Sequence, residues 1–179
     1  MRPGNKKINI AVSSCLLGKP VRYDGQHKRH ALITSLFCSD SDNFECEDFE
    51  SIAICPEMLA GLGTPRPAVQ LVQVGDNIHA LGVEDRNLDV TQLLDNVAKA
   101  FIVQHKNLGG MILQSRSPSC GLGSTNLFNH HDELLGLADG IFAHRLAEAF
   151  PGLPIREDTW FTDRQAVDDF VVQVKNYVA

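Results

Sequence analysis

The stretch Met111-Ile112-Leu113-Gln114-Ser115-Arg116-Ser117-Pro118-Ser119-Cys120-Gly121 decides how the rest of the sequence is interpreted. Its apolar start, after a Gly109-Gly110 break, is typical of a short strand that a sheet buries on both faces. Its Ser-Pro-Ser-Cys-Gly end predicts a turn, because proline and glycine interrupt regular structure. The stretch therefore predicts a buried strand that delivers a cysteine to a loop.

The same pattern occurs at two other places in the sequence. The segment Ile8–Ser14 runs into Cys15, and the segment Ser51–Ile54 runs into Cys55. If the three strands are parallel neighbours in one sheet, their carboxyl ends lie side by side, at the edge where open α/β sheets bind their ligands. We therefore expect the thiols of Cys15, Cys55 and Cys120 to converge on one point.

Length and composition predict one soluble domain over residues 1–179. The chain has 179 residues, of which 44% are hydrophobic and 21% charged, and no apolar run approaches the roughly 20 residues of a membrane span. The basic start is followed by an apolar segment too short for a signal peptide, which predicts a cytoplasmic protein. The net charge of -6 argues against a polybasic surface, so a small-molecule substrate is expected rather than a nucleic-acid polymer.

The alternation of strands, loops and helices predicts an α/β fold with a mostly parallel sheet and Rossmann-like crossovers. Two alternating segments around Gly75-Asp76-Asn77 predict a small hairpin insertion. The segment with His130 and His131 is interpreted as a polar surface linker. Helices are expected over residues 31–37, from Asp89 or Thr91 to about 106, over 139–150, and from a capping box of Thr162 and Gln165 to about 178.

The five cysteines indicate free thiols, catalysis or metal binding, because cytoplasmic conditions oppose structural disulfides. No C-x-x-C motif is present, which argues against a zinc ribbon, a thioredoxin-like site or a bacterial ferredoxin sequence. A site with three sulfur ligands from distant strands remains, holding zinc or an iron–sulfur cluster with an open coordination position. Cys38 and Cys46 follow no strand and are expected not to be ligands.

Three blocks of this sequence together resemble the thiouracil desulfurase family, over most of the chain. The blocks are residues 12–18 with 21–25, residues 55–57 with 61–62 and 65–67, and residues 117–121. The resemblance implies a [4Fe-4S] cluster held by Cys15, Cys55 and Cys120 with one iron free, and removal of sulfur from thiolated pyrimidines without net redox change. The sequence differs from the family at Gln70, usually glutamate, and Gln114, commonly lysine.

The resemblance also implies roles for residues around the cysteines. Glu57 would move a proton and Ser117 would donate a hydrogen bond to the substrate, while sulfur leaves as hydrosulfide. The alternative interpretation is an exposed turn carboxylate and a turn-stabilising hydroxyl. The proposed substrate-binding residues are Arg22, Tyr23, Asp24 and Arg66, although a polar loop such as residues 21–30 can also be a solvated surface loop.

Two other classes of function remain open at the level of sequence. A non-catalytic iron–sulfur or metal-binding protein for sulfur handling needs only the thiols, whereas hydrolysis also needs a group that moves protons. A cysteine hydrolase using Cys120 would need a positioned histidine, which the sequence does not identify. Glu57 and Ser117 are therefore the residues that separate an enzyme from a carrier.

Overall fold

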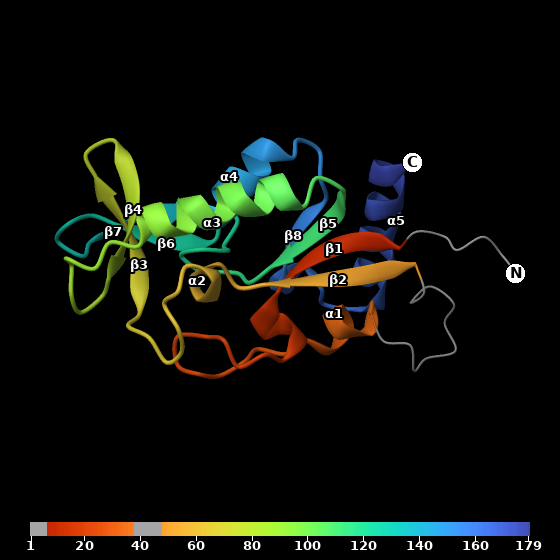
Figure 1. The fold of residues 1–179 in the computed structure, drawn as a ribbon, viewed down its shortest axis with the longest axis horizontal. Coiled ribbons are helices and arrows are strands. Elements are labelled where there is room, and N and C mark those ends of the chain that lie inside the picture. The colour runs from red at the N-terminus through yellow and green to blue at the C-terminus, as the bar shows by residue number, and fades with distance from the viewer. Residues whose placement is uncertain (1–6, 38–47) are drawn as a thin grey trace, which may run out of the picture.

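The computed structural model describes residues 7–37 and 48–179, which form an α/β fold with two sheets (Figure 1). The first sheet has the order β2-β1-β5-β8, and all its neighbouring strands are parallel. Its strands are β1 (Ile8–Ser13), β2 (Phe49–Ile54), β5 (Leu108–Leu113) and β8 (Ile155–Glu157). The prediction that the three cysteine-bearing strands are parallel neighbours is therefore confirmed.

Helices cover both faces of the first sheet. Side chains at alternate positions, such as Ile10 and Val12, pack against α1 (Ala31–Ser35) and α5 (Arg164–Val178). The intervening positions, such as Ala11 and Met111, pack against α3 (Thr91–Gln104) and α4 (Ile141–Ala149). This alternation follows from the two-residue repeat of a strand, and it explains why strand β5 is buried along its whole length.

Two glycines lie inside strand β5 rather than before it, which corrects the expected break. A Cβ atom on Gly109 would lie 2.2 Å from Ile8 Cγ2, and one on Gly110 would lie 2.9 Å from Val174 Cγ2. Glycine is needed here because strand β1 and helix α5 approach the backbone of β5 so closely.

The second sheet has the order β4-β3-β6-β7 and is mixed. The predicted hairpin is present as β3 (Val69–Val74) and β4 (Asn77–Gly82). The expected polar linker is wrong, because it forms a second hairpin, β6 (Thr125–Phe128) and β7 (Leu134–Ala138), whose turn holds His130 and His131. Strands β3 and β6 pair in parallel and join the two hairpins into one sheet.

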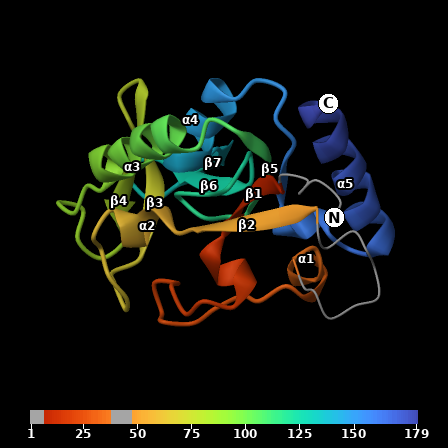
Figure 2. The ribbon, with the colours of Figure 1, turned by 45° about the vertical axis from the view of Figure 1, so that its right-hand side comes forward.

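Helix α3 extends across both sheets, as Figures 1 and 2 show. Leu94 near its start packs on Leu71 and Ala80 of the second sheet, whereas Ala98 and Phe101 pack on the first. The last helix begins after Asp163, whose carboxylate accepts a hydrogen bond from Ala166 N at 2.9 Å, and not at the expected capping box. In the described parts of the chain, no helix is both long and apolar enough to span a membrane.

Candidate functional site

Each of the three cysteines follows a strand of the first sheet. Cys15 lies in the short 3-10 helix η1 (Ser14–Leu17) directly after β1, and the turn closes at Gly18, whose φ of 90° favours glycine. Cys55 follows β2 and precedes the one-turn helix α2 (Pro56–Leu59), where Pro56 suits the first helical position. Cys120 lies in the loop after β5. The sequence therefore positions all three thiols at the carboxyl edge of the sheet.

All three thiols line one cavity of about 380 Å³. One part of its wall comes from the carboxyl ends of β1, β2 and β5 and from the loop at Arg22 and Tyr23. The other part comes from the second sheet. The second-sheet residues in the wall are Val69, Gln70, Thr125, Asn126 and Phe128. The cavity is therefore lined from both sheets, and all three thiols come from segments that follow strands of the first sheet.

The thiols are poorly ionised in their present surroundings. Burial, together with a smaller contribution from the nearby Cys55, raises the pKa of Cys15 to about 11. Burial also raises the pKa of Cys55, and it holds the pKa of Cys120 well above its ordinary value, with smaller contributions from the other two thiols. These mutual effects show that the thiols are close enough to sense one another. Forming three thiolates here requires a compensating positive charge.

The three thiols can be compared with the two kinds of metal centre that the sequence leaves open. In residues 7–37 and 48–179, no group of three His, Cys, Asp or Glu side chains is arranged to hold a metal ion. A zinc ion needs its thiolates about 2.3 Å from one centre, whereas a cluster accepts thiolates that are further apart. Three soft donors around one cavity are the type of ligand that an iron–sulfur cluster uses.

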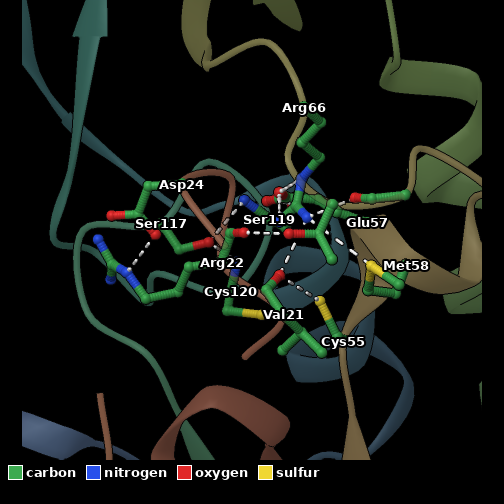
Figure 3. A network of polar contacts seen from close by, with 12 residues as sticks. Val21, Arg22, Asp24, Cys55, Glu57, Met58, Arg66, Ser117, Ser119 and Cys120 are labelled. Atoms are coloured by element: carbon green, nitrogen blue, oxygen red, sulfur yellow. Dashed lines mark hydrogen bonds and ion pairs between the residues drawn. The ribbon is translucent and has the colours of Figure 1, made fainter. Parts of the chain in front are cut away.

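The carboxylate of Glu57 lies in a buried network at the edge of the cavity (Figure 3). Its Oε2 atom accepts a hydrogen bond from Arg66 Nε at 2.6 Å and forms an ion pair with Arg66 Nη2. Its Oε1 atom accepts a hydrogen bond from the hydroxyl of Ser119 at 2.7 Å. Glu57 is only 8% exposed, so the alternative of an exposed turn carboxylate does not hold.

The hydroxyl of Ser117 stabilises the turn that carries Cys120. Its Oγ atom accepts hydrogen bonds from the backbone N–H groups of Ser119 at 3.2 Å and Cys120 at 3.1 Å. The residue also lines the cavity. The oxygen accepts from the turn while its own hydrogen can still be donated, so the turn-stabilising and substrate-facing interpretations are compatible.

The four residues expected to bind substrate are placed differently. Arg22 and Tyr23 line the cavity, but Asp24 does not, since it pairs with Arg22 at 3.6 Å and accepts a hydrogen bond from Gln26 N. Arg66 lines the cavity, yet its Nη1 atom donates to the carbonyls of Val21 and Gly63, both at 2.9 Å. Most donors of Arg66 are therefore already paired with groups of the protein.

Sequence reasoning missed several residues of the site and left two cysteines untested. The sequence assigns no role to Ser119, although the residue is fully buried and its hydroxyl contacts Glu57. Gln70 and Gln114, where the sequence departs from the family that it resembles, both line the cavity, and Gln114 Oε1 lies 3.8 Å from Cys15 Sγ. Cys38 and Cys46 lie outside the described residues.

The fold and the site define an α/β protein that gathers three thiols, a buried ion-paired carboxylate and a serine around one cavity. Comparison with known proteins places it more closely. The profile of the 2-thiouracil desulfurase family matches residues 10–158, and the chain belongs to this family.

Two individual proteins are similar to the chain. An uncharacterized protein of Bacillus subtilis, YbbK, is 32% identical over 120 residues, which cover 64% of this chain and 74% of that protein. The solved structure of TudS, a [4Fe-4S]-dependent thiouracil desulfidase, is 27% identical and superposes with a TM-score of 0.67. That match covers 93% of this chain and 99% of the TudS chain.

Proposed function

We propose that the protein removes sulfur from a thiolated pyrimidine of the 2-thiouracil, 4-thiouracil or thiouridine type. The carbon–sulfur bond breaks, a carbon–oxygen bond to water forms, and sulfur leaves as hydrosulfide. Because water replaces sulfur at the same oxidation level, the reaction needs no external electrons. The observation that carries the proposal is a buried, ion-paired carboxylate beside three thiols in one cavity.

The chemistry of the site fits the cofactor named for TudS. We propose that Cys15, Cys55 and Cys120 hold a [4Fe-4S] cluster, because they supply three soft donors around one cavity and no other cysteine in the described residues lines it. When bound, such a cluster supplies a Lewis-acidic iron with affinity for thiocarbonyl sulfur. The positive charge of the metal centre also offsets the cost of forming three buried thiolates.

The side chains of this chain would perform the proton and binding steps. Glu57, as one partner of an ion pair, is a carboxylate and can accept the proton of an attacking water at Oε1. The hydroxyl hydrogen of Ser117 can be donated to oxygen that develops negative charge at the substrate carbon. Arg22 and Tyr23 line the cavity and would contact the ring. A protein that only carried a cluster would need the three cysteines but not a proton acceptor or a substrate-facing hydroxyl.

The experiment is anaerobic reconstitution followed by a desulfuration assay. We expect iron and sulfide to bind, and 2-thiouracil, 4-thiouracil or 4-thiouridine to yield the oxo product with one equivalent of hydrosulfide and no added reductant. The control is the same protein without reconstitution, which should release none. A fully loaded protein that leaves all three compounds unchanged would instead indicate a cluster-binding protein for sulfur handling.

A further inference from the structure

The carboxylate of Glu57 has almost all of its acceptor positions occupied. A carboxylate offers about four lone-pair sites, two on each oxygen. Arg66 donates to Oε2 from Nε and forms an ion pair with the same oxygen through Nη2, so both contacts of the guanidinium are made on that oxygen. Ser119 uses one site of Oε1. Within the described residues, the remaining site is therefore the second lone pair of Oε1.

The position of Ser119 determines the direction of that remaining site. Ser119 is fully buried and is not part of the cavity wall, whereas Glu57 is. The hydroxyl therefore donates to Oε1 from the protein side. Figure 3 draws this contact together with those between Glu57 and Arg66. Arg66, with Nη1 held by two backbone carbonyls, prevents the carboxylate from turning over.

We propose that Ser119 is a positioning residue that makes Oε1 the proton-accepting atom of Glu57. Its hydroxyl occupies the protein-facing lone pair and leaves the cavity-facing one open. Ser119 belongs to the same turn as Ser117 and Cys120, and Ser117 Oγ accepts from the N–H groups of both Ser119 and Cys120. One turn thus aligns the carboxylate, the substrate-facing hydroxyl and a proposed cluster ligand. This inference rests on the proposed function.

The kinetic test is Ser119→Ala in the cluster-loaded protein. A hydrogen bond to a charged group contributes about 1.5–3 kcal/mol, so kcat should fall about 10- to 100-fold, while KM and iron content stay within about twofold. The matched control is Ser124→Ala, because the Ser124 hydroxyl also donates to a carboxylate, Glu157 Oε1 at 2.5 Å, but Ser124 neither lines the cavity nor contacts Glu57. We expect that variant to keep kcat within about threefold.

A double-mutant cycle shows whether Ser119 acts through Glu57. In a Glu57→Gln background, Ser119→Ala should change kcat by less than about twofold, since the carboxylate that it aligns is already gone. An equal loss in both backgrounds, or loss of iron from Ser119→Ala, would overturn the proposal. If Ser119→Ala does not fold, Ser119→Cys provides the same comparison, because a thiol is a weaker donor of similar shape.

The thermal midpoint of the cluster-free protein provides a readout that does not depend on activity. Ser119→Ala and Glu57→Gln should each lower the midpoint by about 5 °C. The decrease in the double variant should be smaller than the sum of the two, because both single variants remove the same hydrogen bond. Additive shifts would contradict the contact itself. A different outcome is possible, in which the two midpoint shifts are not additive but the loaded wild-type protein leaves thiolated pyrimidines unchanged. That outcome would refute the proposed function, and with it the catalytic role of Ser119, while still confirming the hydrogen bond between Ser119 and Glu57.

Discussion

At the scale of single residues, the chemistry of the site depends on Glu57 having a carboxylate and not merely a polar group. In Glu57→Gln, the amide keeps the size of the side chain but cannot accept the proton of water. We expect iron and sulfide loading to survive and turnover of 2-thiouracil to fall on the order of 10²-fold or more. Hydrosulfide release from the reconstituted variant, compared with its iron content, measures this directly.

Substrate binding is the internal control for Glu57→Gln, since capture of the thiocarbonyl group requires no proton transfer. We expect the KM to change much less than kcat. A wild-type rate in the variant would assign the proton transfer to another residue, with Arg22 and Tyr23 of the cavity wall the first to be tested.

The hydroxyl of Ser117 has two roles, so its removal should affect both turnover and retention of the cluster. Ser117→Ala removes the acceptor of the Ser119 and Cys120 N–H groups and also removes the hydroxyl from the cavity wall. We expect turnover to fall and the cluster to be lost faster, because the turn that carries Cys120 is less constrained. The rate of iron release to a chelator measures the second effect. Retention like that of the wild type would limit Ser117 to the substrate.

At the scale of elements, each cysteine depends on a strand that ends at the same edge of the first sheet. Replacing Cys15, Cys55 or Cys120 by serine should abolish iron and sulfide loading, because no other thiol of the described residues lines the cavity. Cys38→Ser and Cys46→Ser should load normally. Iron and acid-labile sulfide analysis of the five variants tests this. An essential Cys38 or Cys46, with one of the three dispensable, would contradict the ligand assignment.

Asp158 ties three elements together next to the site. Its carboxylate, at the start of η3 (Asp158–Trp160) after β8, accepts from Ser115 N at 2.8 Å and from Lys28 Nζ at 2.9 Å. Burial acts to raise the pKa of Asp158, but the hydrogen bonds from Lys28 and Ser115 outweigh it, and the pKa lies below the ordinary 3.8. The ionised carboxylate therefore stabilises the fold above that pH, and this stabilisation is lost as the pH falls through the lower folded-state pKa.

Asp158→Asn should accordingly lower the free energy of unfolding by about 1.5–3 kcal/mol at pH 7. The difference from the wild type should stay constant down to about pH 5 and shrink below about pH 4, because the wild type loses the same stabilisation there. Urea unfolding at several pH values is the measurement. Asp76→Asn, in the exposed β3–β4 turn, should change stability by less than about 0.5 kcal/mol. A pH-independent difference for Asp158→Asn would refute the linkage.

The elements that the sequence predicts well are those whose burial is uniform. Strand β5 is buried at every position, so its apolar run is visible in the sequence, and the cysteine after it is equally visible. Strands β6 and β7 are short, and β7 exposes Leu134, Leu135 and Leu137, so no alternating pattern identifies them. The pairing of Leu71 with Leu127 also joins residues that are far apart in the chain, which no local pattern reveals.

The same limit applies to the candidate site. The cysteines, Glu57 and Ser117 could be selected because they stand next to strand ends and turns in recognisable blocks. The contacts of Arg66 with Glu57, Val21 and Gly63 could not be predicted from sequence, because they depend on how the loop after α2 folds back. Side chains that position other side chains become visible only in three dimensions.

At the scale of the whole molecule, the two sheets contribute different kinds of residue to the cavity wall. Every thiol in the wall follows a strand of the first sheet. The second sheet contributes Gln70, Asn126 and Phe128 to the wall, but no cysteine. Helix α3 packs on both sheets and fixes their separation. Changes in the second sheet should therefore affect binding of the substrate without affecting the cofactor.

Phe128→Ala tests this division, because the ring is the largest apolar side chain that the second sheet adds to the wall. Stacking of a nucleobase on an aromatic ring contributes about 1–3 kcal/mol, so the KM for 2-thiouracil should rise about 5- to 100-fold. Iron and sulfide content should remain that of the wild type. Leu135→Ala, at an exposed position of β7 outside the wall, is the matched control and should leave KM unchanged. If Phe128→Ala lost its iron while KM held, the second sheet would be supporting the thiols instead of the substrate.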